Sequence, residues 1–502
     1  MPTREVAPAW TGMPPEPETP SPPSAPRPAS GRARRRARPL PAGWPLIALL
    51  AGFPVFWMLG LSNFAATIVA FPMASQLLKR RPIKVPRGFV FWLLFLLWTF
   101  AALAMLGVNP PGTVPDSAAQ RLLGFGLRDL SYLSITVVFL YIGNLTEEEF
   151  PRERLVRLLG WLFIWTVAGG VLGMLLPYFS FTSPFELMLP DSIRFHIFVQ
   201  HLVHPSAAQV QDIGGAKPRP AAPFSYTNVW GYHVTVLAVW FVAGWVLHRR
   251  PGTRLLALGV LAVGTVTLIY SLNRAAWAGC AVAVVYVVFR LAMHRRLLPA
   301  ALMLFAISAG TLVVFATPLQ DVITGRLQNG KSDGIRAFTT RRALELSAQS
   351  PVLGYGSTRA AQGSATSIAV GKSPDCPQCG NFAIGINGYF FMLLMTTGWV
   401  GALLFGAFGL SQVRQARGDP SPIAAAGITV IVMTAFYGVA YDISTWLLVP
   451  MITLAVLWRE AQSRESRRLR EEERLRWTER REVEEREAQR LEAQSSMLER
   501  TR

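Results

Sequence analysis

The sequence predicts an all-α protein that crosses a membrane many times, and three observations support this fold class. Of the 502 residues, 51% are hydrophobic and only 16% are charged. The hydrophobic residues are concentrated in runs of about 17–23, long enough for a helix to cross roughly 30 Å of hydrocarbon. Backbone groups within a bilayer must form hydrogen bonds inside their own segment, which favours helices.

The N-terminal residues 1–43 differ in composition from the rest of the chain. They are rich in Pro and Ala, and they end in the basic stretch "GRARRRARPLPAG" without the pattern of a cleavable signal peptide. Such a composition cannot bury enough apolar surface to fold, so we expect a disordered N-terminus.

The membrane domain is expected to cover residues 44–458 with about twelve transmembrane helices. A long extracytoplasmic loop, 317–386, is expected between spans nine and ten, and a second one at 177–224. The predicted spans are 44–60, 62–78, 88–107, 122–143, 155–176, 225–247, 254–271, 275–293, 297–316, 387–410, 422–441 and 443–458.

The orientation follows from the positions of Lys and Arg. Short cytoplasmic loops are enriched in these residues. When the N-terminus is placed in the cytoplasm, every cytoplasmic loop carries Lys or Arg. We therefore expect a multi-pass protein of the plasma membrane with both termini in the cytoplasm. The cytoplasmic loops are 79–87, 146–157, 248–254, 290–296 and 414–419.

Residues 459–502 form a charged tail in which Arg and Glu alternate at many three- and four-residue spacings. This pattern predicts a solvated cytoplasmic helix with ion pairs along its surface. The alternative is a coiled coil that would allow self-association, although apolar residues are sparse along the tail.

The formal net charge of +19 does not indicate a nucleic-acid-binding protein. The basic residues lie mainly in short clusters between apolar runs, where they orient the helices. We therefore expect no nucleic acid among the partners.

Arg274 lies in "SLNRAAWAGC" (271–280), at the joint between two predicted spans. The orientation places this joint on the outer face, where short connections are normally poor in cations. An unpaired cation next to hydrocarbon is costly, so we expect an interface, a cavity or a partner at Arg274. The alternative is that its side chain extends to the lipid headgroups.

The long outer loop carries further cations in "TGRLQNGKSDGIRAFTTRRALELSAQSPVLGYG" (324–356). A short helix is predicted over 337–348, ended by Ser350 and Pro351. Guanidinium groups bind phosphate in a bidentate manner, so these arginines are candidates for an anionic ligand. The alternative is an amphipathic helix that lies on the headgroups. The candidate cations of this loop are Arg326, Lys331, Arg336, Arg341 and Arg342.

Other residues of the outer loops also have more than one possible role. Arg341 and Glu345 are four apart on the predicted helix and could pair with each other. Gly354 and Gly356 flank Tyr355, which suits a tight turn that lets the backbone approach something closely. In "PFSYTNVWGYHV" (223–234), Asn228 could cap the sixth span or bind a ligand.

Cysteine and histidine residues do not indicate a cofactor. Cys376 and Cys379 lie in "CPQC" on the outer face, where a local disulfide is favoured over redox catalysis. The histidines of loop 177–224 lack the Cys or carboxylate partners of a metal set. No nucleotide-binding motif is found, so we expect neither a metal nor another cofactor. These histidines are His196, His201 and His204.

Four separated segments resemble motifs of one family, the O-antigen ligases and bacterial polysaccharide polymerases, which are membrane glycosyltransferases. "PFSYTNVWGY" is similar to the family's aromatic–Asn-Pro-Asn–Gly segment through Asn228 and Gly231. "SLNRAAW" is similar to its Ser-Arg-containing joint, with Arg274 at the arginine.

The other two segments lie after the joint. "RAFTTRRALELSAQSPVLGYG" is similar to the family's Arg-x3-Trp-x2-Ala-Leu…Pro-x2-Gly-x-Gly signature, with Thr340 in place of Trp. "NGYFFMLLMTTGWVGALLF" is similar to the His-Asn-x-Tyr-Leu…Gly-x2-Gly start of a span, with Asn387 in place of His. The matching residues are Arg336, Ala343, Leu344, Pro351, Gly354, Gly356, Gly398 and Gly401.

The resemblance implies a GT-C-like enzyme that transfers a glycan from a polyprenyl-diphosphate carrier without a metal ion. The family's arginines that engage the donor diphosphate match Arg274 and Arg336. Asn387, at the position of the family's His, can form hydrogen bonds but cannot act as a base. The loop carboxylates Asp321, Asp333 and Glu345 are candidates for accepting the acceptor's proton. The implied partners are the lipid-linked glycan and membrane lipids.

Two other functions are compatible with the sequence. A transporter or flippase of a lipid-linked glycan would require charged or broken helices near the middle of the membrane. Arg128 and Asp129 are the clearest charges within a span, and no repeat relates the two halves. A scaffold that recruits partners through the tail is the third hypothesis.

Overall fold

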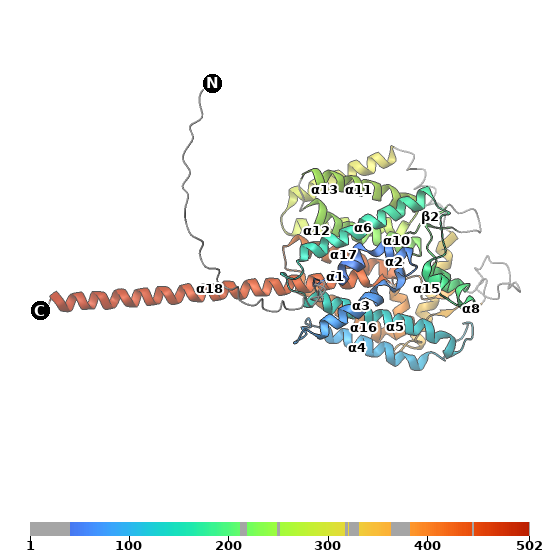
Figure 1. Cartoon of the computed structure of the whole chain (residues 1–502), viewed down its shortest axis with the longest axis horizontal. Coiled ribbons are helices and arrows are strands. Elements are labelled where there is room, and N and C mark those ends of the chain that lie inside the picture. The colour runs from blue at the N-terminus through green and yellow to red at the C-terminus, as the bar shows by residue number, and fades with distance from the viewer. Residues whose placement is uncertain are drawn as a thin grey trace, which may run out of the picture. The chain divides into compact units, whose positions relative to one another are not determined.

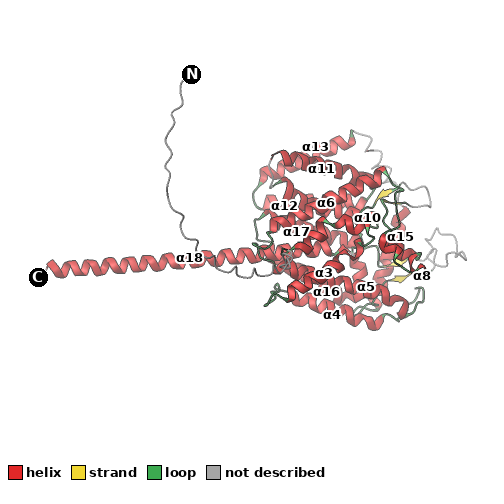
Figure 2. Cartoon of the chain, viewed as in Figure 1, coloured by secondary structure: helices red, strands yellow, loops and turns green. Residues whose placement is uncertain are grey.

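The computed structural model describes residues 41–210, 218–247, 251–316, 320, 331–362, 382–443 and 446–500. Helices dominate this part of the chain (Figure 2). The helices are α1 (Trp44–Ala51), α2 (Phe53–Met58), α3 (Ala65–Leu78), α4 (Phe89–Ala101), α5 (Ala118–Asn144), α6 (Arg152–Leu175), α7 (Pro184–Leu187), α8 (Asp191–Arg194), α9 (Ile197–Val203), α10 (Thr227–Phe241), α11 (Pro251–Tyr270), α12 (Arg274–Met293), α13 (Leu297–Phe315), α15 (Lys331–Gln349), α16 (Tyr389–Ala416), α17 (Pro422–Ala440) and α18 (Leu448–Arg500).

The remaining elements are short. A 3₁₀ turn precedes α3 (Ser62–Phe64), another follows α4 (Ala102–Met105), and a π-helical turn extends α10 (Val242–Val246). Two antiparallel pairs are formed by β1 (Ala208–Gln209) with β2 (Arg219–Pro220), and by β3 (Arg359–Ala360) with β4 (Ala383–Ile384).

Seven helices of the described chain are long and apolar enough to cross a membrane: α5, α6, α10 with its π-helical turn, α11, α12, α16 and α17. Two shorter apolar helical segments lie at Phe89–Met105 and Leu297–Gly310. Each predicted span overlaps helical residues, but the count of about twelve is not reached by this criterion.

The first two predicted spans differ most from the structure. The range 44–60 is divided into α1 and α2 at Gly52, and α2 ends at Met58. Gly60 then adopts a φ of +76°, in the left-handed region that favours glycine. The prediction of one continuous helix over 44–60 is therefore wrong, because apolar composition alone does not reveal where the helix axis breaks.

The helices pack around a core that contains many aromatic side chains. α10 packs on α6, α3 on α5, α16 on α4, α12 on α17, and the start of α18 on α5. Trp92 and Trp230 are fully buried. Their indole N–H groups donate to the hydroxyl of Thr136 and the carbonyl of Thr166, each at 2.8 Å. Pairing of this kind removes the cost of burying a polar N–H away from water.

The loops gather in two groups at the two ends of the helices. In Figure 1, α15 and the short strands lie at the end opposite to the one from which α18 leaves. At the α15 end, Val114 N–H donates to the carbonyl of Ala360 at 2.9 Å. At the other end, Arg290 donates to the carbonyl of Asp419 at 2.6 Å. Loops that the charge pattern assigned to one side therefore contact one another.

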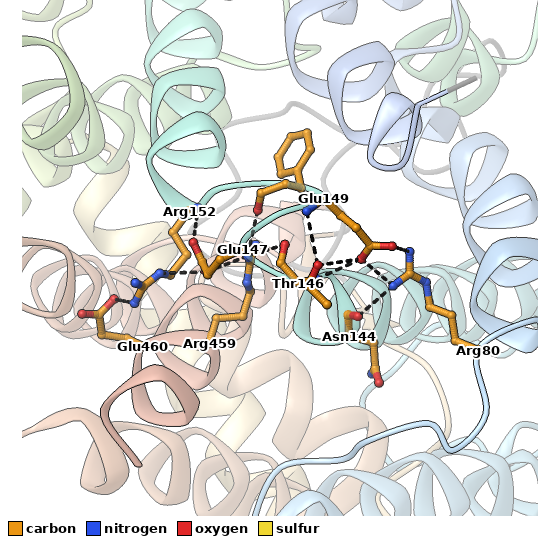
Figure 3. Close-up of polar contacts among 9 residues, drawn as sticks. Arg80, Asn144, Thr146, Glu147, Glu149, Arg152, Arg459 and Glu460 are labelled. Carbon is orange, nitrogen blue, oxygen red and sulfur yellow. Dashed lines mark hydrogen bonds and ion pairs between the residues drawn. The ribbon is translucent and has the colours of Figure 1, made fainter. Parts of the chain in front are cut away.

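An ion-pair network joins the start of the charged tail to the loop between α5 and α6 (Figure 3). Arg459 is only 2% exposed and donates to Glu147 and to the carbonyl of Phe150, each at 2.7 Å. Arg152 pairs with Glu460 and lies 2.9 Å from Glu147. Two cations and two carboxylates thus neutralise each other, which is how charges are accommodated away from water.

The network places the first two residues of the predicted tail with the membrane helices. α18 continues without a break from Leu448 to Arg500, and its side chains are largely exposed beyond Ser466. The packed part of α18 therefore extends to Glu460, and the solvated helix begins a few residues later.

Candidate functional site

The joint between α11 and α12 is a tight turn, as the sequence predicted. α11 ends at Tyr270, and Asn273 is the N-cap of α12, so Arg274 is the first residue of that helix. Leu272 adopts a φ of +53°, which is costly for a residue with a Cβ atom. Such a conformation persists only where surrounding contacts fix it.

Asn273 supplies those contacts. It is 4% exposed, and its Oδ1 accepts hydrogen bonds from the N–H of Ala276 at 3.2 Å and from the hydroxyl of Tyr441. Its Nδ2 donates to the carbonyl of Thr227 at the start of α10. A Cβ atom on Gly231 would lie 2.3 Å from Nδ2, so only glycine there leaves room for the amide. Asn273 therefore connects α10, α12 and the end of α17.

Tyr441 lies directly after α17 and connects the joint to the outer loop. Burial raises the pKa of its hydroxyl, and the positive charges of Arg336 and Arg219 act in the opposite direction. Arg336 is an exposed residue of α15, and Arg219 belongs to β2. Arg336 and Arg219, from separate segments, therefore both lower the pKa of the Tyr441 hydroxyl. This hydroxyl binds Asn273, the residue before Arg274.

Asn387 lies next to the helix that carries Arg336. Its Nδ2 donates to the hydroxyl of Thr339, and that hydroxyl donates to the carbonyl of Arg336 at 3.3 Å. Two residues later, Tyr389 N–H donates to the carbonyl of Tyr441 at 2.7 Å. The elements that carry Arg274, Arg336 and Asn387, the three predicted catalytic residues, thus meet around Tyr441.

Gly354 and Gly356 form a tight turn that packs on a break in α16. Both have positive φ values, 63° and 73°, and Gly398 inside α16 has a φ of 66°. A Cβ atom on Gly354 would lie 2.7 Å from the backbone N of Gly398. Tyr355 N–H donates to the carbonyl of Met395 at 2.7 Å. The sequence predicted that the backbone at these glycines approaches another group closely. That group is the backbone of α16, so the close approach does not require a ligand.

Arg341 and Arg342 pair with a carboxylate on their own helix. Their guanidinium groups donate to Glu345 at 3.0 and 2.9 Å, and Arg342 also donates to the carbonyl of Pro111 at 2.5 Å. The hydrogen bonds from Arg342 and Arg341 lower the pKa of Glu345. The α15 helix extends from Lys331 to Gln349, longer than the predicted 337–348, and ends before Pro351 as expected.

The remaining predicted residues lie apart from these contacts or outside the described chain. Asn228 is half-buried in the first turn of α10, and the N-cap is Tyr226, so the capping alternative is wrong. His204 Nδ1 lies 2.8 Å from a carboxylate oxygen of Glu186. Arg326, Cys376 and Cys379 fall outside the described residues, and so does the predicted disulfide.

Sequence reasoning missed Arg219, Asn273, Tyr441 and Arg359, because each is defined by contacts between distant segments. Arg359 is 3% exposed, and burial lowers its pKa to about 10. Its guanidinium donates to the carbonyls of Val108 and Tyr355, at 2.9 and 3.1 Å. It therefore holds the loop after α4 against the Gly354–Gly356 turn. The only sequence signal for Arg359 was a cation just after that turn.

The helices and the site define a multi-pass membrane protein in which α15 packs on α16 at one end of the bundle. Residues 257–406 match the family model described as O-antigen ligase, which confirms the resemblance found in the motifs. The match includes Arg274, Arg336 and Asn387, and it leaves out Asn228. No curated protein matches the chain. This match supports a role in the transfer of glycans during polysaccharide biosynthesis.

Proposed function

We propose that this protein transfers glycan from a polyprenyl-diphosphate carrier at the extracytoplasmic face, and that Arg274 and Arg336 bind the donor diphosphate. The observation that carries the proposal is a set of hydrogen bonds. Tyr441 binds Asn273, which precedes Arg274, and accepts from Tyr389 at the start of α16, while Asn387 of the same segment contacts α15 one turn from Arg336. Guanidinium groups keep their charge at neutral pH and match the geometry of phosphate oxygens.

In this reaction, an acceptor hydroxyl oxygen forms a bond to the anomeric carbon of the donor glycan. The bond between that carbon and the diphosphate oxygen breaks, and polyprenyl diphosphate leaves with the bonding electrons. Fixed cations stabilise the negative charge that develops on the leaving group. No step requires a metal ion or another cofactor.

The proton of the acceptor hydroxyl must pass to a base. Of the loop carboxylates, Glu345 is held as an anion by two arginines, which makes it a weak base. Asp333 stays a candidate, and so does Asp321, which lies outside the described residues. Asn387 has no titratable group and is assigned to hydrogen bonding near Arg336.

The test is to replace Arg274 or Arg336 by Ala and to analyse lipid-linked glycans in cells. Each variant is expected to reduce transfer by about 100-fold or more, because a fixed charge at the leaving group is lost. Unused lipid-linked glycan should accumulate on the extracytoplasmic leaflet. Arg254→Ala is the control, since Arg254 is an exposed cation at the opposite end of α11.

Two results would contradict the proposal. Normal transfer by both variants, with normal amounts of protein in the membrane, would remove Arg274 and Arg336 from the site. Accumulation confined to the cytoplasmic leaflet would instead indicate a flippase.

A further inference from the structure

The backbone position of Arg274 is set by the turn that precedes α12. It is the first residue of α12, where the backbone N–H groups have no intrahelical partner. The turn before it contains Leu272 in the left-handed region. The backbone position from which the Arg274 side chain extends therefore depends on how Asn273 is held.

The hydroxyl of Tyr441 holds the Asn273 amide from outside α12. It donates to Oδ1, while Thr227 accepts from Nδ2 at 3.3 Å. Tyr441 is 3% exposed, so its hydroxyl does not exchange this bond for one to bulk water. Its backbone carbonyl also accepts from Tyr389 at the start of α16. One residue therefore fixes the α11–α12 joint and the segment that begins at Asn387.

We propose that Asn273 and Tyr441 are positioning residues, which set the geometry between Arg274 and Arg336 so that both cations reach one diphosphate. This inference rests on the proposed function and adds two residues to its site. Neither residue carries a charge, and neither needs to touch the donor. Their effect is to fix the distance between the elements that carry Arg274 and Arg336, which are more than sixty residues apart in sequence.

The variant Tyr441→Phe tests this with little disturbance, because it keeps the buried ring and removes only the hydroxyl. Binding of undecaprenyl diphosphate and undecaprenyl monophosphate is measured for the purified full-length protein in detergent. Diphosphate binding is expected to weaken by about 3- to 10-fold, the usual effect of one lost hydrogen bond. Monophosphate binding should change less, because a single phosphate can be held by one cation.

A second variant separates the helix cap from the link to Tyr441. Asn273→Ser retains an N-cap side chain, but serine is too short to replace the amide at Thr227 and Tyr441. It is expected to reproduce the loss of selectivity seen in Tyr441→Phe. If Tyr441 acts through Arg274, the double variant with Arg274→Ala should bind no more weakly than Arg274→Ala alone.

Tyr232→Phe is the matched control. Tyr232 is also fully buried, and its hydroxyl lies 3.4 Å from that of Thr434, which links α10 to α17 without touching Asn273. Its removal should leave the preference for diphosphate unchanged. Thermal unfolding of each variant shows whether the protein is still folded.

The outcomes distinguish the two proposals. If Arg274→Ala and Arg336→Ala lose diphosphate binding while Tyr441→Phe and Asn273→Ser keep the wild-type preference, the positioning role is wrong and the proposed function stands. If Tyr441→Phe weakens diphosphate binding further in a protein that already carries Arg274→Ala, the positioning role is also wrong. If the wild-type protein does not prefer diphosphate at all, both proposals fall.

Discussion

Single glycines decide how closely the outer segments can approach the helices. Gly231 makes room for the Asn273 amide, and Gly354 and Gly398 let two backbones meet. Trp399 N–H donates to the carbonyl of Pro351 at 2.7 Å across this contact. Glycine is therefore required at these motif positions because a Cβ atom would come too close to a neighbouring atom.

Gly398→Ala is expected to destabilise the protein by at least about 1–3 kcal/mol, because alanine is strained at positive φ. A Cβ atom there would also lie 2.5 Å from the carbonyl oxygen of Pro351. Thermal unfolding in detergent measures the loss. Gly406→Ala, in the same helix with no atom within 4 Å of the added Cβ, should be neutral or slightly stabilising. Equal behaviour of the two variants would contradict this role.

The connections between elements at the α18 end depend on charge. Arg80, after α3, donates to both carboxylate oxygens of Glu149 at 2.7 Å and to the carbonyl of Asn144 at 3.1 Å (Figure 3). The Arg80 hydrogen bond lowers the pKa of Glu149 from 4.5 to about 2, while partial burial opposes the shift. The loop between α5 and α6 is therefore tied to α3 by a carboxylate that stays ionised in mild acid.

The lowered pKa of Glu149 makes part of the folding stability depend on pH. The pKa of Glu149 is lower in the folded protein than in the unfolded chain. Its contribution to the free energy of unfolding is therefore complete above pH 4.5 and is lost as the pH falls toward about 2. The decrease in unfolding temperature between pH 7 and pH 3 is expected to be smaller in Glu149→Gln than in wild type. Glu465→Gln is the control, since that exposed carboxylate lies 3.6 Å from Arg87. An identical decrease in wild type and Glu149→Gln would refute the link.

At the scale of the whole molecule, one helix belongs to both the membrane domain and the solvated tail. The sequence suggested a boundary at residue 459, where charged residues begin. The structure buries Arg459 and Glu460 against Glu147 and Arg152. A truncation must therefore leave these two residues in place to remove the tail without damaging the core.

Two truncations test this boundary. A protein ending at Ser463 should keep its unfolding temperature and its binding of undecaprenyl diphosphate. A protein ending at Trp458 loses Arg459 and Glu460, so Arg152 and Glu147 keep only each other, and it should be less stable by about 1–3 kcal/mol. If both proteins unfold alike, the network does not stabilise the membrane domain. Loss of binding in the longer one would favour a scaffold that requires its tail.

Patterns local in the sequence predicted much of the fold. Each predicted span overlaps helical residues, and Lys and Arg positions group the loops as the contacts do. The breaks near Gly52 and Gly60 were missed, because a broken helix and a continuous one have the same apolar composition. The motif residues Arg274 and Arg336 were found by type and spacing, and the family match covers both.

The sequence by itself determined the class of membrane protein, the approximate helices and the cations of the candidate site. Only the tertiary structure decided which distant segments meet near those cations. Tyr441 and Asn273 meet across 168 residues, and Trp98 donates to the carbonyl of Thr397 across 299. It also paired Arg341 and Arg342 with Glu345 on their own helix. The physical reason is that a hydrogen bond between distant residues depends on chain packing, which no local pattern encodes.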